Sequence, residues 1–287
     1  DLVRSRGLGD VYKRQKEYCE NKGSQNKAAA TLKGVSPATL SQMLNGNWEL
    51  ITEEMWRNVA AQIGYDARQW IIVQTEGYNR MYKLLADAQE NALVLAVTGD
   101  AGCGKSQAIE YYARHHRDVF ALSCSEYWNR KQFLTELLQA MGVEATGSTV
   151  AEMMSEAILT LKRKATPIIV LDEADKLSDQ VLYFFISLYN KLEDHCGIII
   201  CATDYLKKRI TRGVKANRKG YKEIYSRVGR KFIPMPVVNG EDIAAVCVAN
   251  GITDRATIEE IIDDSECDLR RVKRRVHAEK KRLSNND

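Results

Sequence analysis

The sequence lacks any apolar run long enough for a membrane helix, which needs about 20 apolar residues. The apolar runs at residues 92–97 and 198–202 are only long enough for strands. The first residues also lack the apolar core of a secretory signal, so we expect a cytoplasmic protein without a membrane partner. The seven cysteines include no CxxC pair and their number is odd, which favours free, reduced thiols over a disulfide framework or a zinc site.

The overall composition is that of a soluble globular protein, with 45% hydrophobic and 28% charged residues in a chain of 287. This length allows two or three modest domains. The net charge is only +4, but residues 205–231 contain eleven Lys or Arg and a single acid, Glu223. That segment therefore has a net charge of +10 and the rest of the chain −6. Such polarity favours a polyanionic partner that contacts one surface.

Residues 1–15 show no helical or strand period, and they contain Arg4, Arg6, Gly7 and Gly9, which bury little surface. The run at 11–15 is also what the end of a sequencing-library transposon would encode in this reading frame. We therefore expect residues 1–15 to be a non-native leader. The alternative is a disordered N-terminal tail.

Residues 16–66 are predicted to form an N-terminal all-α domain. Within it, a first helical pattern rich in small residues ends at Gly34, which can adopt the positive φ of a tight turn. Ser36 suits the N-cap of a second helix, and Pro37 suits its first position, where a missing N–H costs nothing.

The spacing of these two helices resembles the helix-turn-helix of phage repressors. Thr39 and Gln42 are polar positions on the second helix and are our candidates for DNA contact. The alternative is a three-helix module that binds another protein and does not touch DNA.

A short apolar strand at residues 93–98 leads into GDAGCGKS, which matches the GxxxxGK[ST] pattern of phosphate-binding loops. Its glycines let backbone N–H groups converge on phosphate oxygens. Lys105 would reach the β- and γ-phosphates, and the Ser106 hydroxyl would bind Mg²⁺. Cys103 is interpreted as a small filler, not as a nucleophile. The predicted ATP contacts are Gly99, Asp100, Ala101, Gly102, Cys103, Gly104, Lys105, Ser106 and Gln107.

Asp172 and Glu173 follow a second apolar run at residues 168–171, as expected where a central parallel strand ends. Asp172 would hold Mg²⁺ through its water shell, and Glu173 would orient or deprotonate the attacking water. Alone, the pair could be an ordinary helix N-cap. Because a phosphate loop precedes it, nucleotide chemistry is the favoured interpretation.

A third apolar strand at residues 197–202 ends at Thr203. In a P-loop ATPase with an additional central strand, a polar residue here lies between the water held by the acids and the γ-phosphate, and Thr203 fits that role. Asp204 could instead cap the next helix.

The basic segment after this strand is a candidate surface for the DNA backbone, and such binding should be non-specific and steeply salt-dependent. The alternative is a solvated face without a partner. A second candidate is the loop at residues 127–131, whose aromatic and basic side chains could grip a sugar-phosphate backbone, or could instead cap the sheet. The candidate DNA contacts are Trp128, Arg130, Lys131, Lys207, Lys208, Arg209, Arg212 and Lys215.

The order of a helix-turn-helix, the loop GDAGCGKS, the strand VLDEAD and a short helical C-terminus resembles the AAA+ ATPases that assist DNA transposases, the phage Mu B family. The resemblance extends from about residue 16 to 283. It implies an α/β fold, with a P-loop AAA+ core and a parallel sheet at residues 67–237. It also implies a small helical lid domain at 238–287, beside the N-terminal helix-turn-helix.

The resemblance nominates three further site residues. Arg227, in YSRV, would reach the nucleotide of a neighbouring subunit, with Arg230 as the competing choice. Arg270, in CDLR, would touch the γ-phosphate from the lid of the same subunit, and Thr75 would lie near the adenine. For either arginine the alternative is a solvated side chain or one that contacts DNA phosphates.

The function implied by the resemblance is an ATP-hydrolysing protein that binds double-stranded DNA without sequence specificity as an ATP-dependent homo-oligomer, either a ring or a helical filament. It would recruit and stimulate a DNA transposase. A helicase loader and an ATP-switched helix-turn-helix transcription regulator are the alternatives. The complete Asp172–Glu173 pair speaks against a switch that does not hydrolyse ATP.

Overall fold

The computed structural model describes residues 12, 15–16, 18–20, 24–63, 70–144 and 149–285. The chain forms two compact units, Asp1–Trp70 and Ile71–Asp287. The domain boundary expected between residues 66 and 67 lies outside the described residues.

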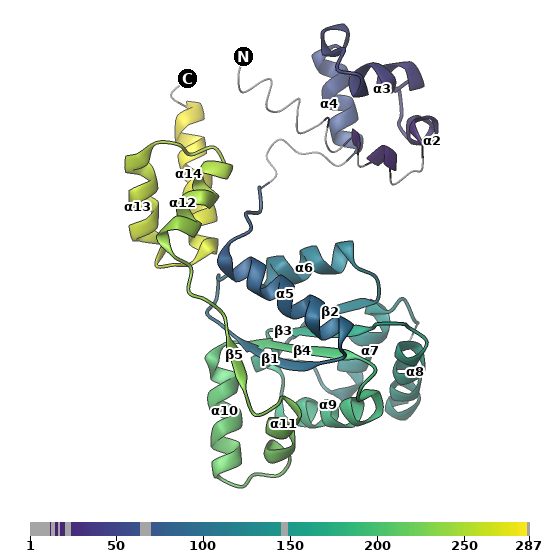
Figure 1. Cartoon of the computed structure of the whole chain (residues 1–287), viewed down its shortest axis with the longest axis vertical. Helices are drawn as coiled ribbons and strands as arrows, with labels where there is room; N and C mark the ends of the chain where they lie inside the picture. The colour runs from purple at the N-terminus through teal and green to yellow at the C-terminus, as the bar shows by residue number, and fades with distance from the viewer. Residues whose placement is uncertain are drawn as a thin grey trace. The chain divides into compact units, whose positions relative to one another are not determined.

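In its described residues the first unit is all-α, as predicted (Figure 1). Ser36 caps the second helix by accepting the Thr39 N–H at 3.0 Å, with Pro37 at the first position, and Gly34 has φ +72°. The first helix ends at Ala30, earlier than the predicted Gly34, because the Thr31 hydroxyl donates to the Ala28 carbonyl and terminates the turn. The elements are α2 Gln25–Ala30, α3 Pro37–Leu44, the 3₁₀ turn η1 Trp48–Leu50 and α4 Glu53–Gln62.

The turn between α2 and α3 is fixed by α4. The Gln62 side-chain amide accepts the Lys33 N–H at 2.7 Å and donates to the Lys33 carbonyl at 2.8 Å. Beneath this clamp, Leu40 and Met43 of α3 pack against Val59 of α4, and all three side chains are fully buried.

Two described residues of the expected leader contact this unit. Gln15 is fully buried and its side chain donates to the Leu40 carbonyl at 3.2 Å. The ring of Tyr12 lies 6.2 Å from that of Trp48. The remainder of residues 1–15 lies outside the described residues, so the origin of the leader stays a prediction.

The second unit is built on a parallel sheet of five strands in the order β2-β3-β4-β1-β5, which confirms the predicted α/β fold. Strand β4 lies between β1 and β3, with Thr98 paired to Ala202 and Leu171 to Ile200. The ends of β1, β3 and β4 therefore meet at one edge. The strands are β1 Val94–Thr98, β2 Val119–Ser123, β3 Ile168–Asp172, β4 Gly197–Ala202 and β5 Phe232–Pro234.

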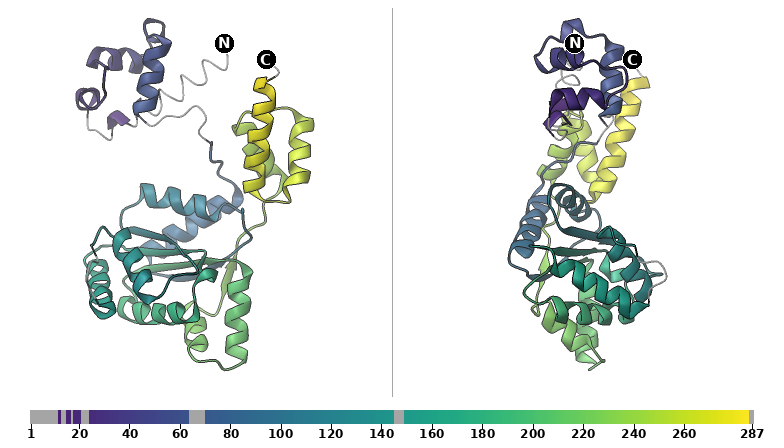
Figure 2. Two further views of the ribbon diagram at one scale, coloured as in Figure 1. Left: turned by 180° about the vertical axis from the view of Figure 1, so that it is seen from behind. Right: turned by 90° about the vertical axis from the view of Figure 1, so that its right-hand side faces the viewer.

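Helices cover both faces of this sheet, so β3 and β4 read as continuous apolar runs and are buried along their length. Two helices lie on one face and the others on the opposite face, as right-handed crossovers require (Figures 1 and 2). The first group is α5 Glu76–Glu90 and α6 Lys105–His115; the second is α7 Arg130–Ala140, α8 Val150–Lys162, α9 Asp179–Leu192, α10 Asp204–Lys215 and α11 Tyr221–Arg227.

Three helices follow the sheet and form a small bundle, α12 Gly240–Ala249, α13 Arg255–Ser265 and α14 Leu269–Asn285. Ile243, Ile261 and Val272 are buried at its centre. Among the described residues, no helix combines the length and the apolar character needed to cross a membrane.

The start of β4 leaves no room for a side chain. A Cβ at Gly197 would lie 2.2 Å from the Ala88 carbonyl oxygen at the end of α5. We expect Gly197→Ala to lower the free energy of unfolding by about 2 kcal/mol and the thermal midpoint by about 4–8 °C. Gly240→Ala is the control, since its Cβ would meet nothing closer than 3.7 Å. Equal midpoints for the two variants in a thermal melt would contradict this packing.

Candidate functional site

The loop between β1 and α6 is shaped for an anion. Gly102 and Gly104 have φ of +80° and +93°, conformations in which other residues are strained. No side chain caps α6, and its first turn contains no acid, so its leading N–H groups have no partner within the helix. Lys105 is 9% exposed, and its ammonium donates to the carbonyls of Gly99 and Asp100 at 2.8 and 2.9 Å. These donors surround a space suited to phosphate.

Ser106 and Asp172 meet across the sheet edge. The Ser106 hydroxyl donates to the Asp172 carboxylate at 2.6 Å, and Asp172 is 8% exposed. A hydroxyl and a carboxylate side by side are oxygen ligands of the kind that Mg²⁺ prefers. The two residues predicted for the metal are therefore adjacent.

Glu173 turns away from the strand that carries Asp172. Its φ of +55° is a left-handed conformation, and its N–H donates to the Asp172 carboxylate at 3.0 Å. Such strain costs on the order of 1–3 kcal/mol and is common at functional sites. The Glu173 carboxylate forms an ion pair with Lys176, and this hydrogen bond raises the pKa of the Lys176 ammonium.

Thr203 lies at the end of β4, between the strands that carry Gly99 and Asp172. It caps α10 by accepting the Tyr205 N–H, so the alternative of Asp204 as the cap is wrong. Both the N–H and the hydroxyl of Thr203 donate to the Asp175 carboxylate, at 3.3 and 3.2 Å. The carboxylate of Asp175 thus joins Thr203 to the segment that follows Glu173.

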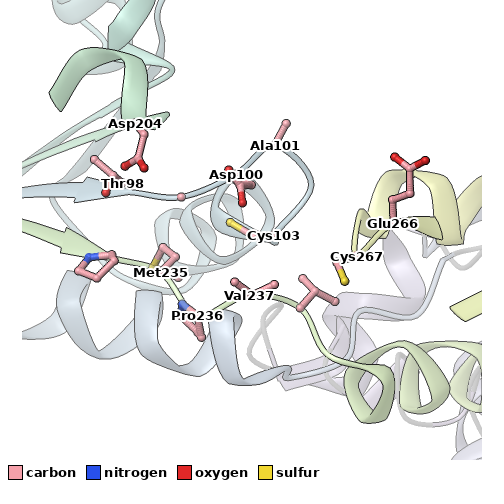
Figure 3. A pocket seen from close by; sticks show the side chains of 13 residues that line it. Thr98, Asp100, Ala101, Cys103, Asp204, Met235, Pro236, Val237, Glu266 and Cys267 are labelled. Atoms are coloured by element: carbon pink, nitrogen blue, oxygen red, sulfur yellow. The ribbon is translucent and has the colours of Figure 1, made fainter. Parts of the chain in front are cut away.

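A cavity of about 330 Å³ opens beside the loop. Figure 3 shows Asp100 and Cys103 of the loop on one side of this cavity. On the other side are Glu266 and Cys267, which lie between α13 and α14. The lining residues are Thr98, Gly99, Asp100, Ala101, Cys103, Asp204, Pro234, Met235, Pro236, Val237, Val238, Glu266 and Cys267. Apolar and polar groups converge here, as in sites for organic ligands.

The bundle of α12, α13 and α14 contacts the phosphate loop directly. The Leu269 N–H donates to the Gly102 carbonyl at 3.1 Å. A Cβ at Gly102 would lie 1.8 Å from the Asp268 carboxylate, so only glycine allows this approach. The start of α14 is therefore held at the mouth of the loop.

The residues present fit ATP and Mg²⁺. The loop offers uncapped N–H groups and a buried ammonium, Ser106 and Asp172 offer oxygen ligands, and the cavity beside them has mixed polarity. Gln107 lies in the uncapped first turn of α6, and its contact with ATP stays a prediction.

The predicted arginines lie outside this cavity. Arg227 ends α11 on its own chain, with its guanidinium carbon 5.0 Å from the ring centre of Tyr189 and a nitrogen 4.0 Å from the Glu193 carboxylate. Arg230 is exposed with φ +58°. Arg270 is exposed at the start of α14, where its N–H donates to the Asp268 carboxylate at 2.7 Å. Their contacts with nucleotide stay predictions.

Thr75 is a helix cap. Its hydroxyl accepts the Tyr78 N–H at 3.2 Å, and the residue is 4% exposed and does not line the cavity. Because its side chain is used in this way, the structure does not support a contact between Thr75 and adenine.

All seven cysteines are free, as predicted, and six of them are buried. Burial, followed by the nearby Asp172 carboxylate, raises the pKa of the Cys124 thiol to about 12. Burial likewise raises the pKa of the Cys201 thiol far above its usual value. These thiols stay protonated at neutral pH, which makes them poor nucleophiles.

The basic residues of α10 separate into two sets. Lys207, Lys208, Arg212 and Lys215 are exposed on one face of the helix. Arg209 points inward, with a side chain that is 16% exposed and that donates to the carbonyls of Asp175 and Leu177 at 3.2 and 2.7 Å. The prediction that Arg209 contacts DNA is therefore wrong for this structure, because its guanidinium is already occupied.

The predicted DNA contacts in and after the loop before α7 also differ in exposure. Trp128 is 5% exposed and packs in the core of the sheet. The alternative, in which the aromatic side chain covers the sheet, is therefore correct for Trp128. A side chain buried in this way cannot stack on DNA. Arg130 and Lys131 are exposed at the start of α7. Arg130 lines a groove of about 510 Å³ together with Lys219 from the turn before α11.

In the first unit, Thr39 and Gln42 are half-exposed on α3. The Thr39 hydroxyl shares a hydrogen bond of 2.8 Å with that of Ser36. Contact of either residue with DNA stays a prediction.

Sequence reasoning missed three parts of the site. Asp175 received no role, although it lies in the same VLDEAD run as the predicted acids. Met235 lines the cavity and lies between two prolines, Pro234 and Pro236. Prolines this close together are a local signal of a loop, which could have drawn attention to this segment. The approach of Asp268 to the phosphate loop has no local signal.

Comparison with known proteins finds similarity to an AAA domain and to a transposition protein. A family model described as an AAA domain matches residues 88–210, which include the phosphate loop and both acids. The Mu-like prophage FluMu DNA transposition protein B of Haemophilus influenzae is 24% identical over 237 residues, which cover 79% of this chain and 80% of the relative. The chain is therefore similar to a Mu-like transposition protein B and contains a segment that matches an AAA domain.

A solved structure has a similar fold. The ORC1 protein of Aeropyrum pernix, in complex with DNA, matches with a TM-score of 0.51 and 16% sequence identity. The match covers 72% of this chain and 59% of that chain. At this identity the likeness shows the shared AAA+ fold alone.

Lys105 provides the buried positive charge of the AAA+ phosphate loop. We expect Lys105→Ala to weaken nucleotide binding by at least about 100-fold, since a charge-assisted bond to phosphate is lost. Titration with a fluorescent ATP analogue measures this, and Lys191→Ala, an exposed lysine of α9, is the control. Equal affinity in the Lys105 and Lys191 variants would show that the nucleotide binds elsewhere.

Proposed function

We propose that this protein is an ATPase that assembles on double-stranded DNA in an ATP-dependent manner and recruits and stimulates a DNA transposase. The observation that carries the proposal is the meeting of Ser106 with Asp172 at 2.6 Å beside a loop that offers Lys105 and uncapped amides. The relationship to a transposition protein B supports the transposase partner. ATP and DNA are both available in the cytoplasm, where we expect the protein to act.

The residues of the site have distinct roles in hydrolysis. Lys105 and the N–H groups of the loop bind the phosphates, and Ser106 and Asp172 hold Mg²⁺. Bound Mg²⁺ supplies neutralisation of phosphate charge. Glu173 accepts a proton from the attacking water once its carboxylate leaves Lys176. Thr203 lies between the water held by the acids and the γ-phosphate bound by the loop.

DNA binding is supported by the exposed cations of the second unit. Lys207, Lys208, Arg212 and Lys215 form one face of α10, and Arg130 and Lys219 line a groove nearby. Cations arranged in this way neutralise phosphates without reading bases, so affinity should fall steeply with salt. The solved ORC1 neighbour was determined in complex with DNA, which agrees with this role. Thr39 and Gln42 of a helix-turn-helix would add contacts to DNA or to the transposase.

Assembly into a ring or filament would complete the site. Arg227 is held at the surface by Tyr189 and Glu193, away from its own cavity, where a neighbouring subunit could receive it. Arg270 would reach the γ-phosphate from the lid. Hydrolysis stimulated by the transposase would then dismantle the assembly.

Glu173→Gln removes the proposed proton acceptor but keeps the size of the side chain. ATP should still bind, while phosphate release should slow by at least about 100-fold, the usual contribution of a general base. The ATP-bound protein should then stay longer on duplex DNA, as measured by dissociation in stopped flow. Phosphate release within two-fold of wild type would remove Glu173 from the mechanism.

The action of Arg227 across subunits is tested by mixing two inactive variants. Arg227→Ala lacks the arginine, and Lys105→Ala lacks nucleotide. In a 1:1 mixture about one quarter of the interfaces should combine an intact Lys105 with an intact Arg227. ATPase activity should therefore reappear on mixing. Its failure to reappear at any ratio would exclude action in trans.

A further inference from the structure

The geometry of α10 separates Arg209 from its basic neighbours. A helix turns 100° per residue, so Lys207, Lys208, Arg212 and Lys215 fall within one exposed face, whereas Arg209 lies beside the buried residues. A side chain that is 16% exposed is poorly placed to meet a DNA phosphate. Its guanidinium must therefore have another role.

Arg209 contacts the segment that follows the water-activating glutamate. Its two terminal nitrogens donate to the carbonyls of Asp175 and Leu177, on either side of Lys176. Asp175 also accepts both hydrogen bonds from Thr203. Arg209 thus holds the short turn η2, Ala174–Lys176, which determines the direction of Glu173 and the position of Thr203.

Asp179 joins this contact to the outer surface. Its carboxylate, at the start of α9, lies 3.1 Å from Arg209 and 3.3 Å from Arg218, and it accepts the Tyr221 hydroxyl at 2.6 Å. The side chain of Arg209 is 16% exposed, whereas that of Arg218 is 61% exposed. One carboxylate is therefore shared between an inner cation and an outer cation.

Close packing makes this arrangement stiff. A Cβ at Gly213 of α10 would lie 2.4 Å from the Tyr221 ring, and a Cβ at Gly220 would lie 2.4 Å from the Tyr183 ring. Tyr183 and Tyr221 meet edge to face at 5.9 Å. Helices α10 and α11 are therefore packed closely against each other and against α9, which carries Asp179.

We propose that Arg209 and Asp179 couple DNA binding on α10 and α11 to ATP hydrolysis, with Arg209 as a positioning residue for Glu173 and Thr203. This inference rests on the proposed function. A phosphate that binds Arg218 withdraws one cation from Asp179, whose charge is then balanced by Arg209. The bonds from Arg209 to the carbonyls of Asp175 and Leu177 carry the change to the turn beside Glu173, and turnover rises.

The test separates coupling from simple DNA affinity. ATP turnover is measured without DNA and with saturating duplex, together with KM for ATP, DNA affinity by fluorescence anisotropy, and the thermal midpoint. The variants are Arg209→Gln, Arg209→Lys and Asp179→Asn. Lys208→Gln is the matched control, since it removes an exposed charge from the same helix.

For wild type we expect DNA to raise turnover. In Lys208→Gln, DNA should bind several-fold more weakly, yet the increase should persist at saturation. In Arg209→Gln and Asp179→Asn, the ratio of turnover with and without DNA should fall close to one, with KM for ATP within two-fold of wild type. Asp179→Asn should bind DNA at least as tightly as wild type, because a negative charge is removed. Arg209→Lys should retain part of the increase, since a lysine still donates to a carbonyl.

Three results would overturn the inference. Arg209→Gln could behave like Lys208→Gln, with weaker DNA binding but a full increase at saturation. Asp179→Asn could leave the ratio of turnover with and without DNA unchanged. This result would overturn the inference even if Arg209→Gln lowers the thermal midpoint and does not fold. Wild-type turnover could also be indifferent to bound DNA. If wild type neither hydrolyses ATP nor binds duplex, the proposed function fails as well.

Discussion

The hydrogen bond between Ser106 and Asp172 depends on strand order more than on any local feature. The two residues are far apart in the chain, and they meet because β4 lies between β1 and β3 and all three strands run in parallel. Parallel strands place their carboxyl ends together, and ligands of such sheets bind there. The phosphate loop, the acids and Thr203 are therefore functional only as parts of one sheet edge.

The positively charged side chains of the second unit differ in how far they are buried. Lys105 is buried against the carbonyls of Gly99 and Asp100, and the half-buried Arg209 donates to the carbonyls of Asp175 and Leu177. The exposed cations on α10 have no such internal role in the contacts described above. A buried cation is tolerated only with hydrogen-bond acceptors, so depth separates positioning charges from those available to a polyanion.

Much of the fold follows from local sequence. The strands at 94–98, 168–172 and 197–202, the cap by Ser36 with Pro37, and the phosphate loop were all predictable because spacing, capping and apolar runs are local signals. The expectation of an AAA+ core came from the resemblance in domain order, because the motifs in their strand–loop–helix context indicate a phosphate-binding loop without distinguishing among P-loop ATPases.

The remaining features depend on contacts between distant segments. Trp128 lies beside basic residues in sequence but faces the core, and Arg209 lies within a basic run but faces Asp179. The helical period of α10 could have separated Arg209 from its neighbours, whereas nothing local reports that Asp268 lies against Gly102. Sequence proximity identified the right segments, but it did not say which side chains in them face solvent.

The central claim is that bound ATP joins subunits into an assembly whose cationic surface holds duplex DNA. Electron microscopy of the protein with duplex DNA, in ATP and in ADP, tests it most directly. The account predicts rings or filaments along the duplex in ATP and their loss in ADP. Single subunits scattered on the duplex in both nucleotides would contradict it.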